Sequence, residues 1–360
     1  MLLARSLWAR FVWLGVALAA GGVLLAAPAP GQRKSTDPVP VALAWAQAQR
    51  DTIAANLPDG TSYTPVVFLD AHSSVGTAES KDGKFLRLML TGADAPARQL
   101  RALPVGEHPS FQTFTLAGDV LAWAEGTDGG HVRLWSMNLR DSRPARLVTT
   151  DTGQAAFYQS QYDLVIAEGR LRWAARGTGG ETEIRSVALT GGPVEVRREA
   201  GTWQLSAWPW LVDGVNSAAG ATTLRNLSTG RDVPVVHARK RATTDCSPTW
   251  CRVVSLTGDG ANRIELMHPD GTARKTIAGD NSETAIADVA PLDRFEVYSQ
   301  LGPNSDLAGS TGLLVYETTT RRTVEITPSA GKILYRGGVL WWSTGNLESI
   351  VWHSLDLRTV

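Results

Sequence analysis

The stretch Leu121-Ala-Trp-Ala-Glu125, Gly126-Thr-Asp-Gly-Gly130 and Val132-Arg-Leu-Trp-Ser-Met137 contains the pattern that decides the fold. Two short apolar runs flank a glycine-rich turn, and the runs contain valine, leucine and tryptophan, which favour β-strands. Trp123 in the first run is followed eleven residues later by Leu134 in the second. The stretch therefore predicts a β-hairpin whose strands carry large apolar side chains.

The same hairpin recurs along the chain, and recurrence at a fixed period indicates a repeat architecture. A bulky residue and an aliphatic residue eleven positions later are found again at Val75 and Leu86, and at Val253 and Ile264. The later copies lengthen or shorten the connection between the two strands. The aliphatic anchors of the second strands are Leu86, Leu134, Ile184, Leu224, Ile264, Leu314 and Ile350.

Repeats of roughly 40–50 residues with four short strands are typical of β-propeller blades. Most hairpins lead through a turn into another strand-like run, such as residues 98–103 and 322–326. We count seven units and keep six as the alternative, because the last unit is short and ends without such a run. Residues 50–55 resemble the missing strand. The sequence thus predicts an all-β, seven-bladed propeller over residues 49–360, closed by an N-terminal strand that protects both sheet edges.

Both faces of a propeller blade pack against neighbouring blades. Val132 and Leu134 lie on one face of their predicted strand, and Trp135 and Met137 lie on the other. Burying one such large side chain contributes roughly 1.5–3 kcal/mol. We therefore expect the tryptophans, of which the chain has 13, to be mainly packing residues.

Residues 1–35 have the layout of a targeting segment. Two arginines and no acidic residue precede an uncharged apolar run over residues 11–27, which predicts a hydrophobic helix serving as a signal peptide or a signal anchor. The run is near the lower limit for crossing a bilayer, about 17–25 residues. Pro28 and Pro30 would hinder cleavage after Ala27 or Ala29, so we favour a retained membrane anchor and keep a cleaved signal as the alternative. Residues 36–48 are then a linker, and the propeller is extracytoplasmic.

Cys246 and Cys251 are the only two cysteines, and the four residues between them include Pro248. An even, close pair in an exported protein usually forms a disulfide. A metal site would need two further ligands, and neither His237 nor His268 has a tight spacing to the pair. We predict a disulfide that holds one hairpin, with free thiols and a metal site as the alternatives.

The composition excludes several classes of function. With 35 basic and 35 acidic residues the chain lacks the basic field of a nucleic-acid binder, so we expect no nucleic-acid partner. The sequence has no Gly-x-Ser-x-Gly turn, His-Glu-x-x-His helix, phosphate-binding loop or dinucleotide glycine motif, and these are the signatures of common enzymes. We therefore assign no catalytic residue, no metal ligand and no cofactor.

Two pairs of residues are candidates for a ligand surface. Asp70 and His72 would project from one face of a strand, where the acid could orient the imidazole, although we favour a structural polar pair near the inner strand of the first blade. Trp208 and Trp210 would share a strand face and could present an aromatic surface to a sugar or peptide, although we favour core packing.

The segment from Asp280 to Asp288 also contains Asn281, Ser282 and Glu283, whose oxygens could hold calcium. The segment lacks the spacing of a dedicated calcium loop. We therefore expect a solvated turn.

Glu79-Ser-Lys-Asp-Gly-Lys84, before Phe85-Leu-Arg-Leu88, is similar to the Ser-Pro-Asp-Gly-Lys turn of TolB-like propeller repeats, with Lys81 in place of the proline. Residues 41–360 resemble uncharacterised exported TolB-like propellers of high-GC Gram-positive bacteria. This resemblance implies an extracytoplasmic, non-enzymatic propeller that binds other molecules, and we expect the partner to be a protein or polymer of the cell envelope. The residues leave two alternatives open: an exported hydrolase or lyase that acts on cell-wall carbohydrate through the central funnel, and a structural scaffold within a membrane complex.

Overall fold

The computed structural model describes residues 37–360 except for 94, 215–216, 219, 237–241, 257–261, 280, 304 and 347–348. Pro38–Val360 form one compact unit. The hydrophobic helix predicted over residues 11–27 lies outside the described residues. Within the described part, no helix is long and apolar enough to cross a membrane.

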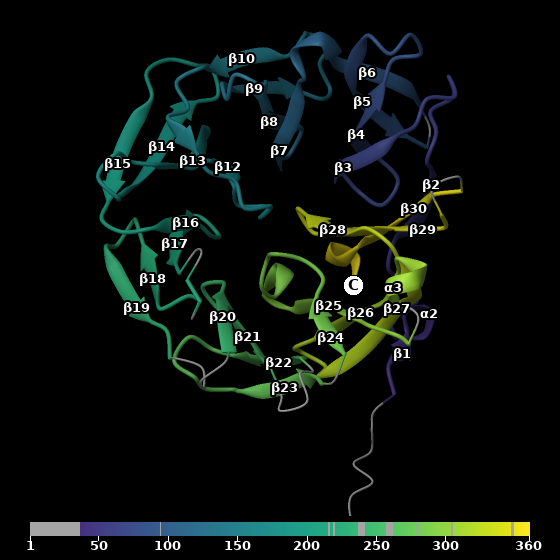
Figure 1. Ribbon diagram of the computed structural model, residues 1–360, viewed down its shortest axis with the longest axis vertical. Helices are drawn as coiled ribbons and strands as arrows, with labels where there is room; N and C mark the ends of the chain where they lie inside the picture. Colours follow the sequence, from purple (N-terminus) through teal and green to yellow (C-terminus); the bar gives the residue numbers. More distant parts are fainter. Residues whose placement is uncertain are drawn as a thin grey trace, which may run out of the picture. The chain divides into compact units, whose positions relative to one another are not determined.

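Seven sheets of four or five strands are arranged in a ring (Figure 1), and we use the word channel for the centre of this ring. Each sheet is one blade, in which the strands follow one another outward from the channel in chain order, except that β1 and β2 from the N-terminal part form the outer edges of two blades. The seven sheets confirm the predicted seven-bladed propeller over the alternative of six.

The first three blades are made of consecutive segments of the chain. Blade one contains β3 (Thr64–Phe68), β4 (Ser74–Glu79), β5 (Phe85–Gly92) and β6 (Ala95–Pro104). Blade two contains β7 (Ser110–Ala117), β8 (Val120–Gly126), β9 (Val132–Asn138) and β10 (Arg146–Thr149), after the 3₁₀ turn η1 (Val105–Glu107). Blade three contains β11 (Gln154–Ala155), β12 (Leu164–Ala167), β13 (Arg170–Arg176), β14 (Thr182–Ala188) and β15 (Glu195–Glu199).

The remaining blades follow the same plan, and the last two also receive strands from the N-terminal part. Blade four contains β16 (Trp203–Leu205), β17 (Trp210–Asp213), β18 (Thr223–Asn226) and β19 (Arg231–Pro234). Blade five contains β20 (Ala242–Cys246), β21 (Cys251–Leu256), β22 (Asn262–Met267) and β23 (Lys275–Ala278). Blade six contains β24 (Ser282–Thr284), β25 (Phe295–Gln300), β26 (Thr311–Glu317), β27 (Arg322–Ala330) and β1 (Val39–Pro40). Blade seven contains β28 (Ile333–Arg336), β29 (Val339–Thr344), β30 (Val351–Asp356) and β2 (Arg50–Ala54).

Besides η1, four short helical segments of the described residues lie outside the sheets. They are α2 (Val41–Ala44), η2 (Pro291–Asp293), α3 (Ser305–Ala308) and η3 (Leu357–Thr359).

The predicted repeat corresponds to the two middle strands of each blade. Each of the seven aliphatic anchors belongs to a different blade: six lie in the third strand from the channel, and Ile350 immediately precedes β30. The predicted double burial is also found in β9. Leu134 packs in the apolar cluster between blades two and three, whereas Trp135 and Met137 pack in the cluster between blades one and two.

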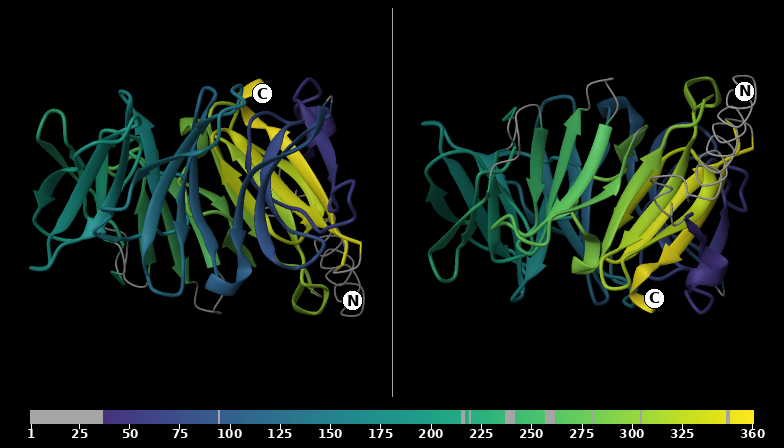
Figure 2. Two further views of the ribbon diagram at one scale, coloured as in Figure 1. Left: turned by 90° about the horizontal axis from the view of Figure 1, so that it is seen from above. Right: turned by 90° about the horizontal axis from the view of Figure 1, so that it is seen from below.

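The ring closes where the two ends of the folded unit meet. Strand β2 pairs antiparallel with β30, with Ile53 opposite Trp352. Figure 2 shows the purple N-terminal segment beside the yellow C-terminal strands in both views. Closure by residues 50–55 was predicted because a ring leaves no unpaired seam between its first and last blades, and the pairing confirms it.

The segment predicted as a linker, residues 36–48, is packed on blade six from Val39 onward. Strand β1 pairs in parallel with β27, with Val39 opposite Val324. Trp45 is 7% exposed, and its ring lies edge-on to Phe295 with the centroids 5.5 Å apart. Burial of the apolar side chains of this segment is more favourable than their exposure in an extended linker. The folded unit therefore begins at Pro38.

The turn that resembles TolB-like repeats connects β4 to β5. Ser80 Oγ donates to Asp82 Oδ1 at 2.6 Å, and the same carboxylate oxygen accepts the Lys84 N–H at 3.2 Å. Gly83 has a φ of +68°, which glycine adopts without steric cost. The serine, aspartate and glycine of the motif therefore each serve the turn geometry.

Candidate functional site

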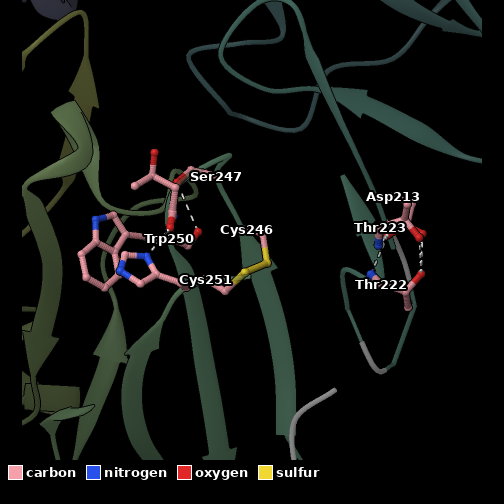
Figure 3. The surroundings of a disulfide bond; sticks show 9 residues. Asp213, Thr222, Thr223, Cys246, Ser247, Trp250 and Cys251 are labelled. Atoms are coloured by element: carbon pink, nitrogen blue, oxygen red, sulfur yellow. Dashed lines mark hydrogen bonds between the residues drawn. A yellow bond between two sulfur atoms is a disulfide. The ribbon is translucent and has the colours of Figure 1, made fainter. Parts of the chain in front are cut away.

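A disulfide joins Cys246 to Cys251 (Figure 3), as predicted. The two cysteines are directly opposite each other at the end of the β20–β21 hairpin, with Cα atoms 4.1 Å apart. The connecting turn is held by the Ser247 N–H, which donates to the Trp250 carbonyl at 2.8 Å. The covalent bond therefore fixes the end of the strand of blade five that lies nearest the channel.

Two segments from different blades enter the central channel. In blade three, β11 and β12 pair with the same strand β13, with Ala155 opposite Ala175 and Leu164 opposite Trp173, so residues 156–163 loop out between them. In blade six, residues 285–294 connect β24 to β25. Both segments run toward the centre of the ring (Figure 1).

The two segments meet in a cluster that we call the cross-channel bridge (Ser160, Gln161, Asp163, Asp288 and Arg336). Ser160 Oγ donates to Asp288 Oδ1 at 2.6 Å, and the Gln161 N–H donates to Asp288 Oδ2 at 3.2 Å. Arg336, at the end of β28, donates to the carbonyl oxygens of Ser160 and Gln161, each at 3.4 Å, and to that of Phe114. The bridge thus connects blades two, three, six and seven.

The carboxyl groups of the bridge are buried. Asp163 and Asp288 are 7% and 8% exposed. Burial raises the pKa of Asp163 to about 6, against the opposing effects of the Tyr158 N–H and Arg336. Burial also raises the pKa of Asp288, although the hydrogen bonds from Ser160 and Gln161 oppose the shift. Desolvation outweighs the favourable contacts at both groups.

A buried ion pair holds the blade-six segment in place. Arg252 on β21 lies 2.9 Å from Glu296 on β25, and their side chains are 3% and 0% exposed. Arg252 also donates to the carbonyl oxygens of Ile286 at 3.1 Å and Ala287 at 2.9 Å. These contacts tie blade five to the channel segment of blade six. Removing either partner of the ion pair would leave an uncompensated buried charge.

A cavity of about 490 Å³ lies inside the ring beside these contacts. Its walls come from Tyr158 of the looped-out segment, from the first strands β16, β20 and β24, and from described residues of the β17–β18 connection. We call it the channel cavity. The described lining residues are Tyr158, Gln204, Val212, Asp213, Gly214, Ser217, Gly220, Ala221, Thr243, Asp245, Cys246, Arg252 and Thr284 to Ala287.

The charged side chains of the channel cavity differ in what they offer a ligand. Asp213 Oδ1 accepts the N–H groups of Thr222 at 2.6 Å and Thr223 at 2.8 Å, and its Oδ2 accepts the Thr222 hydroxyl (Figure 3). The Asp245 side chain is 50% exposed, and its Oδ2 lies 3.5 Å from Arg252 Nη2. Asp245 is therefore the carboxylate that the described lining presents to solvent.

The structure does not pair Asp70 with the imidazole of His72, which was the less favoured interpretation of these two residues. Both Asp70 and His72 lie in the turn between β3 and β4, and Asp70 Oδ1 accepts the N–H groups of His72 and Ser73, each at 2.8 Å. His72 Nδ1 lies 2.8 Å from Asp51 Oδ2, on strand β2 of blade seven. Neither residue is in the expected strand: Asp70 shapes a turn, and His72 contacts the closing strand.

Trp208 and Trp210 lie on different sides of blade four, and not on one strand face as expected. Trp208 belongs to the turn between β16 and β17, where the Trp210 N–H donates to the Ala207 carbonyl at 2.9 Å. The Trp208 ring packs on the blade-three side, 4.2 Å from the Arg172 guanidinium. Trp210 begins β17 and packs on the blade-five side. Side chains two positions apart share a face only within a continuous strand, and the turn interrupts the strand between these two residues.

The segment between Asp280 and Asp288 is not a solvated turn throughout. Asp280 lies outside the described residues, Ser282–Thr284 form β24, and Asp288 is buried in the cross-channel bridge. In the described part of the chain, no three His, Cys, Asp or Glu side chains are placed to hold a metal ion.

No family model and no curated protein matches the chain. Among solved structures, the uncharacterized protein lmo1340 from Listeria monocytogenes EGD-e is similar, with a TM-score of 0.53 and 11% identity over 87% of this chain and 95% of that one.

A puromycin-hydrolyzing peptidase of Mycobacterium tuberculosis has a TM-score of 0.53 and 13% identity, covering 83% of this chain and 51% of that one. A prolyl endopeptidase structure has a TM-score of 0.52 and 14% identity, covering 83% of this chain and 48% of that one. The chain thus spans about half the length of these peptidases. A putative TolB from Agrobacterium tumefaciens has a TM-score of 0.44 and 12% identity, covering 72% and 93%. At these identities the three matches with a TM-score above 0.5 show the propeller fold alone.

Proposed function

We propose that the chain is an exported, non-enzymatic binding module of the cell envelope, whose channel cavity receives part of a protein or polymer partner. One observation carries the proposal. Asp213 and Arg252 are engaged in holding the walls of the cavity, whereas the half-exposed Asp245 faces the open space. A concave site with a few convergent polar groups is the usual form of a binding site.

A binding role fits the cavity better than hydrolysis of carbohydrate. Glycoside hydrolysis generally uses two carboxyl groups, one as an acid and one as a base or nucleophile. Asp213 and Asp245 are the carboxylates of the described lining, and three hydrogen bonds to Asp213 fix its orientation. This leaves Asp245 as a single accessible acid.

The apolar run over residues 11–27 provides the export route in this proposal, as a retained anchor or as a cleaved signal. The disulfide supports a location outside the cytosol, because disulfides persist in oxidising compartments. An anchored protein stays with membranes through a high-salt and alkaline wash. Release into the medium with a new N-terminus near Pro28 would instead establish cleavage.

Site-specific crosslinking tests the binding role. A photoreactive amino acid replaces Gln204 in the channel cavity, and a control replaces Arg143, whose side chain is 83% exposed on blade two. In intact cells we expect a discrete crosslinked adduct from position 204 that the control does not give. The same adducts from both positions, or none from position 204, would contradict the proposal.

A further inference from the structure

We propose that the channel cavity binds a protonated amine or guanidinium, the side chain of a lysine or arginine on a partner polypeptide, with Asp245 as its counter-ion. This inference rests on the proposed binding function and names the chemistry that the cavity recognises. It is carried by the balance of charge around the cavity, by the position of Asp245 and by the nature of the remaining lining.

The charge balance of the described lining is negative. The described lining contains two carboxylates, Asp213 and Asp245, and one guanidinium, Arg252. The charge of Arg252 is matched by Glu296, 2.9 Å away and fully buried, and its N–H groups also donate to carbonyl oxygens of the blade-six segment. Arg252 therefore has little capacity left to neutralise Asp245, from which it is 3.5 Å distant.

The cross-channel bridge does not reverse this balance. It contains the two carboxyl groups of Asp163 and Asp288 and one guanidinium, that of Arg336, which donates to the carbonyl oxygens of Ser160 and Gln161. Charged groups around a cleft shape the electrostatic potential in its interior. Because the described lining holds two carboxylates and one guanidinium, we expect the channel cavity to favour a cation over an anion.

The size and the neutral lining suit a long side chain. Small-ligand sites occupy about 300–1,000 Å³, and the channel cavity, at about 490 Å³, lies within that range. Gln204 and Thr243 provide hydrogen-bonding groups for the polar atoms of a peptide. Tyr158 is the aromatic residue of the described lining, and aromatic rings attract cations.

The same lining argues against a sugar ring as the main ligand. Trp208 and Trp210 were the candidates for an aromatic platform, but their rings pack toward different neighbouring blades. A polypeptide side chain needs no such platform, because the carboxylate of Asp245 provides the interaction that selects it.

Binding of short peptides to the full-length protein tests the inference by isothermal titration. The probes are acetyl-Gly-Lys-Gly-amide and its analogues with glutamate or norleucine in the middle position. We expect the lysine peptide to bind at least tenfold more tightly than either analogue. Raising the salt concentration from 50 to 500 mM should weaken its binding severalfold, because salt screens the attraction.

The variant Asp245→Asn should weaken binding of the lysine peptide about tenfold. The matched control is Asp128→Asn, which removes an acid that is 71% exposed on blade two and should leave the affinity within twofold. Urea unfolding of both variants verifies that they are folded. Equal affinity for the three peptides, or an unchanged affinity in Asp245→Asn, would overturn the inference.

The outcomes separate this inference from the proposed function. If the crosslink from position 204 persists in Asp245→Asn and none of the peptides binds, the cavity binds a partner through other chemistry and only the inference fails. If a chitosan oligosaccharide binds in an Asp245-dependent way and the lysine peptide does not, the ligand is an amino sugar and the polypeptide assignment is wrong.

Discussion

Ser160 in blade three and Asp288 in blade six are hydrogen-bonded across the channel, with 2.6 Å between the serine Oγ and the aspartate Oδ1. The two residues are 128 positions apart in the chain, and each lies in a segment that leaves its blade to enter the ring. The contact connects blades that are not neighbours, in a fold whose other packing is mainly between adjacent blades.

Replacing Ser160 by alanine should destabilise the propeller. The change removes a hydroxyl that donates to a buried carboxylate, and leaving such a group unsatisfied costs about 1–3 kcal/mol. We expect a loss of that size in the free energy of unfolding, measured by urea denaturation. Ser142→Ala, at an exposed position, should change it by less than about 0.5 kcal/mol. An equal effect of the two substitutions would mean that the bridge contributes nothing.

Asp163 should make stability depend on pH. Its pKa is raised from 3.8 to about 6 in the folded protein, so folding favours the protonated form. Its stabilising contribution is complete below about pH 4 and is lost as the pH rises to about 6. A shift of this size corresponds to about 3 kcal/mol.

The variant Asp163→Asn retains an oxygen for the Tyr158 N–H and carries no charge. It should be more stable than the parent protein at pH 7 and should show a flatter profile between pH 4 and pH 7. Unfolding curves measured across this range test the expectation, and a variant whose profile is as steep as that of the parent protein would contradict it.

The disulfide should be fully formed in the isolated protein, and its contribution to the free energy of unfolding should be modest. Thiol labelling of unreduced, denatured protein should leave both Cys246 and Cys251 unmodified. The bond closes a ring between residues only five positions apart, so its removal in a Cys246→Ala, Cys251→Ala double variant should cost about 2 kcal/mol or less. A loss above about 4 kcal/mol would show that the bond does more than hold one hairpin.

The seam of the ring should be sensitive to charge on its inner face. Ile53 on β2 is partly buried against the apolar clusters of blades one and seven, so Ile53→Asp places a charge on an apolar, partly desolvated face and should cost about 2 kcal/mol. Ala54→Asp is a control on the exposed face of the same strand. The urea midpoint should fall for the first variant and stay within error for the second, and a similar fall in both would indicate that closure does not depend on this packing.

The sequence predicted the ring because its signals are local. The strand pattern around Trp123 and Leu134, the glycine turns and the close cysteine pair all report on contacts within one blade. Closure by residues 50–55 was deduced because the last unit lacks its fourth strand, and this is visible only when all seven units are compared. The expectation that Trp208 and Trp210 share a strand face failed for a local reason, since a turn at residues 207–209 ends the alternation, whereas the favoured prediction that both rings pack in the core is what the structure shows.

The centre of the ring was not predictable in the same way. Residues 156–163 have no turn signal that would remove them from a strand, and their path is set by Asp288 and Arg336, which are distant in the chain. Asp288 was expected in a solvated turn because a single sequence does not show that Ser160 lies opposite it. Asp245 was overlooked because an isolated acid gains its role from the neighbouring blades.

The parallel pairing of β1 with β27 has a mechanical consequence. Val39 and Pro40 are bonded to blade six, and the next strand, β2, is bonded to blade seven. Tension applied to the chain at Pro38 must therefore shear one ladder before any load reaches the strand that seals the ring. If the preceding segment anchors the protein, we expect a pulling force to break the pairing of β1 with β27 before the pairing of β2 with β30. The ring would then remain closed.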